Sequence, residues 1–153
     1  MQVLDSIFYS FFLVPILYPG ILMLVSIFVA FRLRPAKPSR IALAVAMLPS
    51  LLMLTLFYSL AIHLHQHLGG WPASIGDQGF PQALLIHEHI ALNYFLILLL
   101  FNVIIWPVAY ILCAIIRRWR AALFYWGIYA LANLVCFGAM LFAPSQFWNW
   151  WVD

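Results

Sequence analysis

The chain has 153 residues, of which 67% are hydrophobic and 7% are charged, whereas roughly a quarter of the residues in a soluble globular domain are charged. So few charges cannot cover a soluble fold, so the composition excludes that class and makes the lipid bilayer the expected solvent. The net charge of +3 rests on seven basic residues split between two short segments, which is a poor electrostatic footprint for nucleic acid, and we expect no such partner.

Four apolar segments are long enough to cross a membrane, and they cover about residues 7–31, 41–62, 90–116 and 121–143. Each exceeds the roughly 20 residues that a helix needs to cross about 30 Å of hydrocarbon. Each is expected to be helical, because an isolated strand cannot satisfy its backbone in lipid. The sequence therefore predicts an all-α membrane protein, a four-transmembrane-helix bundle with antiparallel up-down topology that forms one integral membrane domain over residues 1–153.

The first span is expected to remain in the chain rather than to be removed as a signal peptide. The residues before it include Asp5 and no lysine or arginine, and its apolar run is longer than that of a signal peptide. The stretch RLRPAKPSR, residues 32–40, follows it. Ser39 in this stretch is a residue type that caps helix N-termini, so it is expected to cap the second span.

The charges of the chain separate by sign between its connections. All seven basic residues lie in the first and third connections, and all four acidic residues lie at the termini or in the second connection. The positive-inside rule then places both basic connections in the cytoplasm. We expect a multi-pass protein of a cytoplasmic (inner) membrane, with both termini and the second connection on the non-cytoplasmic side.

The second connection, expected at about residues 63–89, contains all five histidines and two of the four acidic residues. Counted along the helices from the nearest cytoplasmic arginine, His63 lies about 34 Å and His89 about 42 Å away, so both are near the outer headgroup layer. His63 and His67 are four residues apart and share a helix face. Gly69-Gly70 is expected to end this helix, and Pro81 suits the first turn of a helical lead into the third span. We expect His63 to meet His89 across neighbouring helices, with His67 in support, while His65 and His87 point elsewhere.

Two interpretations of these histidines stay open. In the first, they hold a metal ion, because imidazole suits zinc, copper and nickel. The ligands would be His63, His67 and His89, with His65, His87, Asp77 and Glu88 as further candidates. A variant of this interpretation is a b-type haem held by one histidine from each helix. In the second, the histidines are interfacial residues that bind lipid headgroups and cap carbonyl groups.

Other motifs that carry chemistry are incomplete. The stretch HEHIA, residues 87–91, lacks the second histidine of the zinc-protease motif, because Ala91 stands in its place. No carboxylate lies inside the four spans, which argues against an aspartyl protease and against a proton relay. Cys113 and Cys136 are expected at depths of about 6 and 24 Å, too far apart for a disulfide.

The C-terminal stretch PSQFWNWWVD, residues 144–153, follows the fourth span. Pro144 is expected to end the helix, and the aromatic residues after it predict an outer membrane-interface belt. They are Phe147, Trp148, Trp150 and Trp151. A surface for a protein partner is the alternative, because tryptophan-rich patches often anchor interfaces.

The function expected from these features is non-enzymatic: a small scaffold or accessory subunit that contacts lipid and either a protein partner or further copies of itself. The alternative is a protein that binds metal or haem through the outer histidines. A transporter of a neutral solute is less favoured, because the spans contain no charged residue that would mark a pathway.

Overall fold

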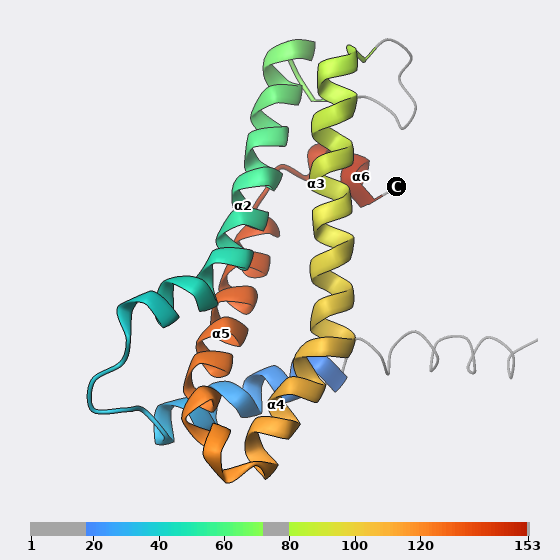
Figure 1. Ribbon diagram of the computed structural model, residues 1–153. Coiled ribbons are helices and arrows are strands. Elements are labelled where there is room, and N and C mark those ends of the chain that lie inside the picture. Colours follow the sequence, from blue (N-terminus) through green and yellow to red (C-terminus); the bar gives the residue numbers. More distant parts are fainter. Residues whose placement is uncertain (1–17, 72–79, 153) are drawn as a thin grey trace, which may run out of the picture. The chain divides into compact units, whose positions relative to one another are not determined.

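The computed structural model describes residues 18–71 and 80–152, and this part of the chain is helical and contains no strand. The all-helical class predicted from the sequence is thus confirmed for these residues (Figure 1). In chain order, the helices are Tyr18–Arg32, α2 (Arg40–Leu68), α3 (Gln82–Leu100), the π-helical turn η1 (Phe101–Ile105), α4 (Trp106–Ile115), the 3₁₀ segment η2 (Arg117–Ala122), α5 (Leu123–Met140) and α6 (Ser145–Val152).

Three helical stretches of the described part are long and apolar enough to cross a membrane, namely Arg40–Leu68, Gln82–Ile115 and Arg117–Met140. The protein is therefore a helical, multi-pass membrane protein. The helix Tyr18–Arg32 is apolar but shorter. The predicted first span begins near residue 7, and its residues before Tyr18 lie outside the described part.

The second and third spans continue as helices beyond their apolar runs. The polar segment between them was expected at about residues 63–89, and α2 continues into it to Leu68 while α3 begins at Gln82, in agreement with the expected stop at Gly69-Gly70 and lead at Pro81. Gly69 follows α2 with a φ of 67°, the left-handed conformation that commonly ends a helix. All five histidines consequently lie within helices. The apolar run marks where hydrocarbon ends, while the backbone hydrogen bonds of a helix continue into the polar layer.

The stretch predicted as one span over residues 90–116 contains a π turn at its centre. Pro107 lacks an N–H group and its ring crowds the preceding turn, so the regular helical pattern cannot pass through it. The Trp106 N–H instead donates to the carbonyl of Phe101, five residues earlier. Here the Tyr129 hydroxyl also donates to Oδ1 of Asn102 over 2.7 Å. A polar contact between helices thus lies beside the backbone irregularity.

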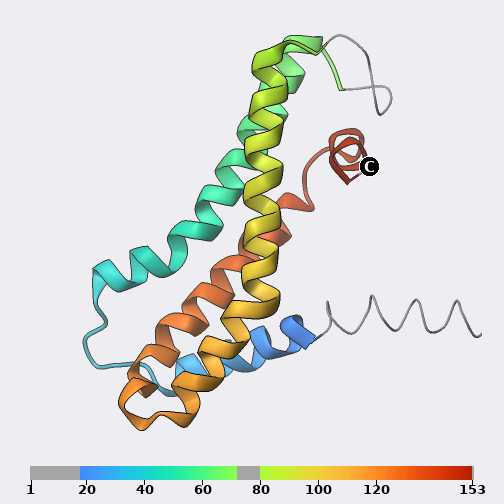
Figure 2. The same ribbon diagram turned by 45° about the vertical axis from the view of Figure 1, so that its right-hand side comes forward.

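The chain divides into two compact units, one comprising residues 1–47 and 98–131, the other residues 48–97 and 132–153. In the first unit, the helix Tyr18–Arg32 packs on α5 through small residues (Figure 2). A Cβ atom at Gly127 would collide with the Cβ of Ala30 and would lie 2.6 Å from the backbone oxygen of Ser26. The absence of a side chain at Gly127 therefore permits this close approach.

The connection before α2 also belongs to the first unit. The N–H of Ala42 donates to Oγ of Ser39 over 3.4 Å, so the predicted cap of the second span is confirmed. The N–H of Ser39 donates to the hydroxyl of Tyr125 over 2.9 Å. This second bond fixes the end of the basic connection against the first turns of α5.

In the second unit, the later part of α2 lies beside the first part of α3 (Figures 1 and 2). The Tyr94 hydroxyl donates to the carbonyl of Pro49 over 3.0 Å, and Ser59 contacts His87 at 3.1 Å. Contacting residue numbers rise on α2 as they fall on α3, so these two segments run in opposite directions.

The C-terminal aromatic stretch folds back onto α2 as the helix α6, which the sequence analysis did not predict. Phe57 of α2 has an exposed fraction of 0% and contacts three rings of α6. These rings belong to Phe147, Trp148 and Trp151, with centroid distances of 5.0, 5.8 and 5.6 Å. Phe147 is also fully buried. Part of the predicted belt therefore forms a core inside the second unit.

Candidate functional site

A chain of three polar side chains joins α2 to α3 in the second unit. Oγ of Ser59 lies 3.1 Å from Nε2 of His87, and Nδ1 of His87 lies 3.1 Å from Nδ1 of His63. Both contacts are partly buried. Ser59 and His63 share a face of α2 because they are four residues apart, and His87 faces both of them from α3.

The hydrogen bonds indicate where the protons of Ser59, His87 and His63 lie. The Ser59 hydroxyl donates its one proton to the carbonyl of Leu56 over 3.0 Å. Nε2 of His87 must then donate to Ser59, so Nδ1 of a neutral His87 carries the lone pair. Nδ1–H of His63 donates to that lone pair, which leaves Nε2 of His63 as the unprotonated nitrogen. Two neutral imidazoles of defined tautomer therefore lie in contact.

The other histidines lie apart from this chain. His89 is exposed, and its Nδ1–H donates to the carbonyl of Leu85 on its own helix over 2.7 Å. His67 is exposed, and His65 is exposed with its ring edge-on to Trp71 at a centroid distance of 4.8 Å. The structure therefore pairs His63 with His87, where the sequence analysis paired it with His89 and turned His87 away.

A metal ion would find two ligands in this pair. Two imidazole nitrogens on one tetrahedral zinc ion lie about 3.3 Å apart, close to the 3.1 Å between the two Nδ1 atoms. Within residues 18–71 and 80–152, however, no group of three or more histidine, cysteine, aspartate or glutamate side chains is placed to hold a metal. Glu88 is partly buried on α3, and Asp77 lies outside the described residues. The described donors thus fit part of a metal site.

A b-type haem does not fit between His63 and His87. A haem held by one histidine from each helix has its iron and macrocycle between the two ligating nitrogens. The two Nδ1 atoms are in direct hydrogen-bond contact at 3.1 Å, which leaves no space for the macrocycle. This pair of helices would have to separate before the two rings could ligate one haem.

The order Ser59, His87, His63 matches the nucleophile, base and orienting group of a hydrolytic triad in distance alone. The proton arrangement argues against that chemistry, because the Ser59 proton is donated to Leu56 and His87 has no serine proton to accept. The three side chains instead form a polar clamp between two helices. Such clamps are a usual role of serine and histidine within membranes.

A second polar feature lies on the outward surface of α3. His89 and Asn93 are four residues apart and both are exposed. The exposed apolar residues around them on this helix are Ile86, Ile90, Ile97 and Leu100. Two polar side chains consequently interrupt a surface that otherwise suits lipid.

Comparisons with protein-family models, with curated proteins and with solved structures find no match for this chain. No catalytic, metal-ligating or partner-binding residue can therefore be carried over from a relative. What the protein does has to be inferred from its own side chains and surfaces.

Proposed function

We propose that the protein is a non-enzymatic scaffold or accessory subunit of a cytoplasmic (inner) membrane, acting through contacts with lipid and with a protein partner or further copies of itself. The outward pair His89 and Asn93 on α3 supports this proposal. An amide has two N–H donors and an oxygen acceptor, and lipid chains satisfy none of them. Polar side chains on membrane helices commonly bind a neighbouring helix for this reason.

Replacement of Asn93 by leucine tests this contact. We expect association of the protein with its partner or with second copies to weaken by about threefold to thirtyfold, the range that one interhelical polar contact gives in membranes. Energy transfer between differently labelled copies in lipid vesicles measures the self-association. Co-purification from the native membrane, compared between wild type and Asn93→Leu, measures a heterologous partner.

The matched control for this experiment is Asn102→Leu. Asn102 accepts a hydrogen bond from Tyr129 inside the first unit, so its loss should lower stability and leave association unchanged. If Asn93→Leu associates as wild type does in both assays, the surface of α3 is not a protein contact and the scaffold proposal loses its support.

The proposal includes a topology in which the chain crosses the membrane four times as an antiparallel up-down bundle, with both basic connections in the cytoplasm. The placement of all seven basic residues in the first and third connections supports it. In a variant with both native cysteines replaced by alanine, a membrane-impermeant thiol reagent outside the cell should label Ser74→Cys. It should spare Ala36→Cys, and labelling of position 36 from outside would reverse the orientation.

A second candidate function is metal binding by His63 and His87, and the 3.1 Å contact between their Nδ1 atoms favours it. The ion would bind both Nδ1 atoms, and the proton between them would move to Nε2 of His63. Binding should weaken as the pH falls, because a protonated imidazole has no lone pair for a metal. Equilibrium dialysis against zinc, copper and nickel should show His63→Ala and His87→Ala losing the metal. The control His89→Ala should retain it, and a wild type without bound metal would end this candidate.

The transporter of a neutral solute stays the less favoured proposal, because the spans contain no charged residue that would mark a pathway. The buried polar side chains of the described residues are Ser26, Ser50 and Asn133. Ser26 donates to the carbonyl of Met23 within its own helix over 2.7 Å.

A further inference from the structure

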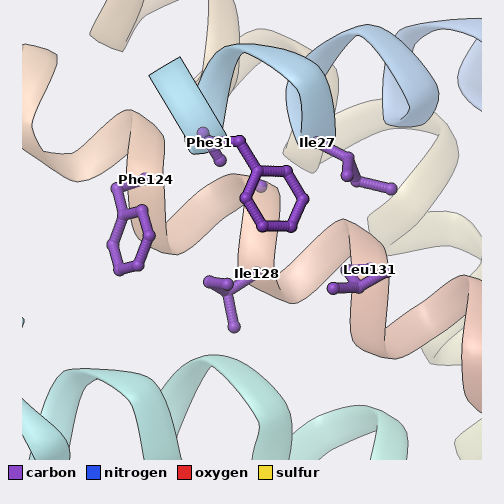
Figure 3. Close-up of a pocket in the computed structure, with 7 residues that line it drawn as sticks. Ile27, Phe31, Phe124, Ile128 and Leu131 are labelled. Carbon is purple, nitrogen blue, oxygen red and sulfur yellow. The ribbon is translucent and has the colours of Figure 1, made fainter. Parts of the chain in front are cut away.

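An open, shallow apolar groove lies between the helix Tyr18–Arg32 and α5 in the first unit (Figure 3). Ile27 and Phe31 line it from the first helix, and Phe124, Ile128 and Leu131 line it from α5. The other two lining residues are Ala30 and Gly127, whose contact brings the helices together. The large side chains beside these small ones leave a hollow that runs along the helices.

One end of this groove lies at the basic connection. Phe31 is followed directly by Arg32, and Phe124 is preceded by Arg120 one turn earlier in the chain. Both phenylalanines line the same groove, so these arginines lie close to its lining residues in the chain, and Nε of Arg120 donates to the carbonyl of Ala114 over 3.3 Å. The hydrogen bond from Ser39 to Tyr125 also holds the connection that carries Arg34 and Lys37 against the start of α5.

The charges on the described residues of this unit have one sign. All seven basic residues of the chain belong to the unit, and all seven are exposed. Residues 18–47 and 98–131, the part of the unit that the structure describes, contain no aspartate or glutamate. The guanidinium of Arg32 lies 5.3 Å from the ring centroid of Phe28, so an aromatic face holds this cation beside the helix. These cations are therefore suited to bind an anion that the described residues do not provide.

We propose that the first unit binds one anionic phospholipid, with an acyl chain in the groove and the phosphate among Arg32, Arg34 and Arg120. An acyl chain matches an open groove whose lining is wholly apolar, and basic clusters at the cytoplasmic ends of membrane helices bind anionic headgroups. Because the apolar groove and the basic cluster adjoin, the ligand that fits both has an acyl chain and a phosphate in one molecule. This site is independent of the outer surface proposed above to contact other proteins.

Native mass spectrometry of the full-length, delipidated protein tests the proposal by titration with two lipids that share acyl chains. We expect one phosphatidylglycerol to bind in preference to phosphatidylcholine, by about fivefold for each arginine that contacts the phosphate. Arg32→Gln with Arg34→Gln should remove most of that preference and leave phosphatidylcholine binding unchanged. Equal binding of the two lipids by the wild type would overturn the headgroup assignment.

The groove is tested separately from the charges. Ile128→Trp fills the hollow and should lower the binding of both lipids at least tenfold, whereas Ile111→Trp, at an exposed apolar position of α4, should bind as wild type does. Phe31→Ala removes one exposed wall of the groove without changing a buried residue, and it should weaken binding as well. Circular dichroism melting confirms that each variant is folded.

Three outcomes would contradict the proposal. If Ile128→Trp and Phe31→Ala are both folded and bind lipid as the wild type does, the acyl chain of the lipid lies outside the groove. Displacement of phosphatidylglycerol by equal concentrations of glycerol phosphate would show that the arginines bind free phosphate without the groove. A dimer that forms in the wild type and is lost in Ile128→Trp would show that a second copy covers the groove.

Discussion

Replacement of Gly127 by alanine should destabilise the first unit by about 1–3 kcal/mol, the usual cost of an added methyl group in a closely packed contact. The new Cβ would collide with the Cβ of Ala30 and lie 2.6 Å from the backbone oxygen of Ser26. A backbone oxygen cannot rotate away as the end of a side chain can, so the two helices must separate. Membrane helices rely on small residues for such contacts, and Gly127→Val should cost more. The free energy of unfolding in mixed detergent micelles measures the loss.

The same helix provides the control. Gly138 also lies in α5, and a Cβ built there has no atom within 4 Å. Gly138→Ala should be neutral or stabilise the protein by up to about 1 kcal/mol, because alanine has the higher helix propensity. Ala30→Gly should partly restore the stability of Gly127→Ala by removing one colliding atom. Equal stabilities of Gly127→Ala and Gly138→Ala would show that this close approach is absent.

The presence of the long helices could be predicted, whereas several of their ends could not. Apolar runs and the need to satisfy the backbone in lipid place a helix over each long span. Ser39 was recognised because its cap depends on a local sequence signal. Hydropathy gives no signal for the continuation of α2 to Leu68, since histidine and glutamine break the apolar run, but Gly69-Gly70 gave a local signal for the end of this helix. The π turn before Pro107 could not be predicted, because a proline in a helix gives a kink as readily as a π turn.

One histidine of the observed pair could be predicted from the sequence, and its partner could not. His63 was identified, but its partner was chosen by counting depth along straight helices, and that count favoured His89. The inner face of α3 decides the pairing instead, and it includes Leu84, His87, Ala91 and Tyr94. Leu84 and Ala91 are buried, with exposed fractions of 1% and 0%. A small Ala91 four residues after His87, amid large apolar residues, was the available signal for a face packed against another helix.

The aromatic C-terminal stretch shows what local sequence cannot determine. Its tryptophans are equally suited to a membrane interface and to a core, because their rings are apolar while the indole N–H binds water or headgroups. The environment of this stretch depends on Phe57, which lies 90 positions before Phe147 and 94 before Trp151 and around which both rings pack. A contact at that separation has no signature within either segment.

Phe57→Ala should therefore release α6 and destabilise the second unit by about 3 kcal/mol, the lower end of the range for a buried phenylalanine. The lower end applies because lipid, in place of water, reduces the transfer term and leaves mainly the cavity and the lost ring contacts. Trp148 and Trp151 lose their contacts with Phe57, so tryptophan emission should shift to longer wavelength. Limited proteolysis should also cut the turn at residues 141–144 more rapidly in the variant.

Phe142→Ala is the matched control for this substitution, since the Phe142 side chain has an exposed fraction of 88%. It removes the same atoms from a surface position, and its effect on the free energy of unfolding should stay within about 0.5 kcal/mol. Equal effects of the two substitutions, or unchanged emission in Phe57→Ala, would show that α6 does not pack on α2. If the free energies of unfolding of the two variants differ by about 3 kcal/mol and the tryptophan emission shifts in Phe57→Ala, the aromatic stretch is mainly part of the core. Only its less buried rings would then be available to contact lipid or a partner.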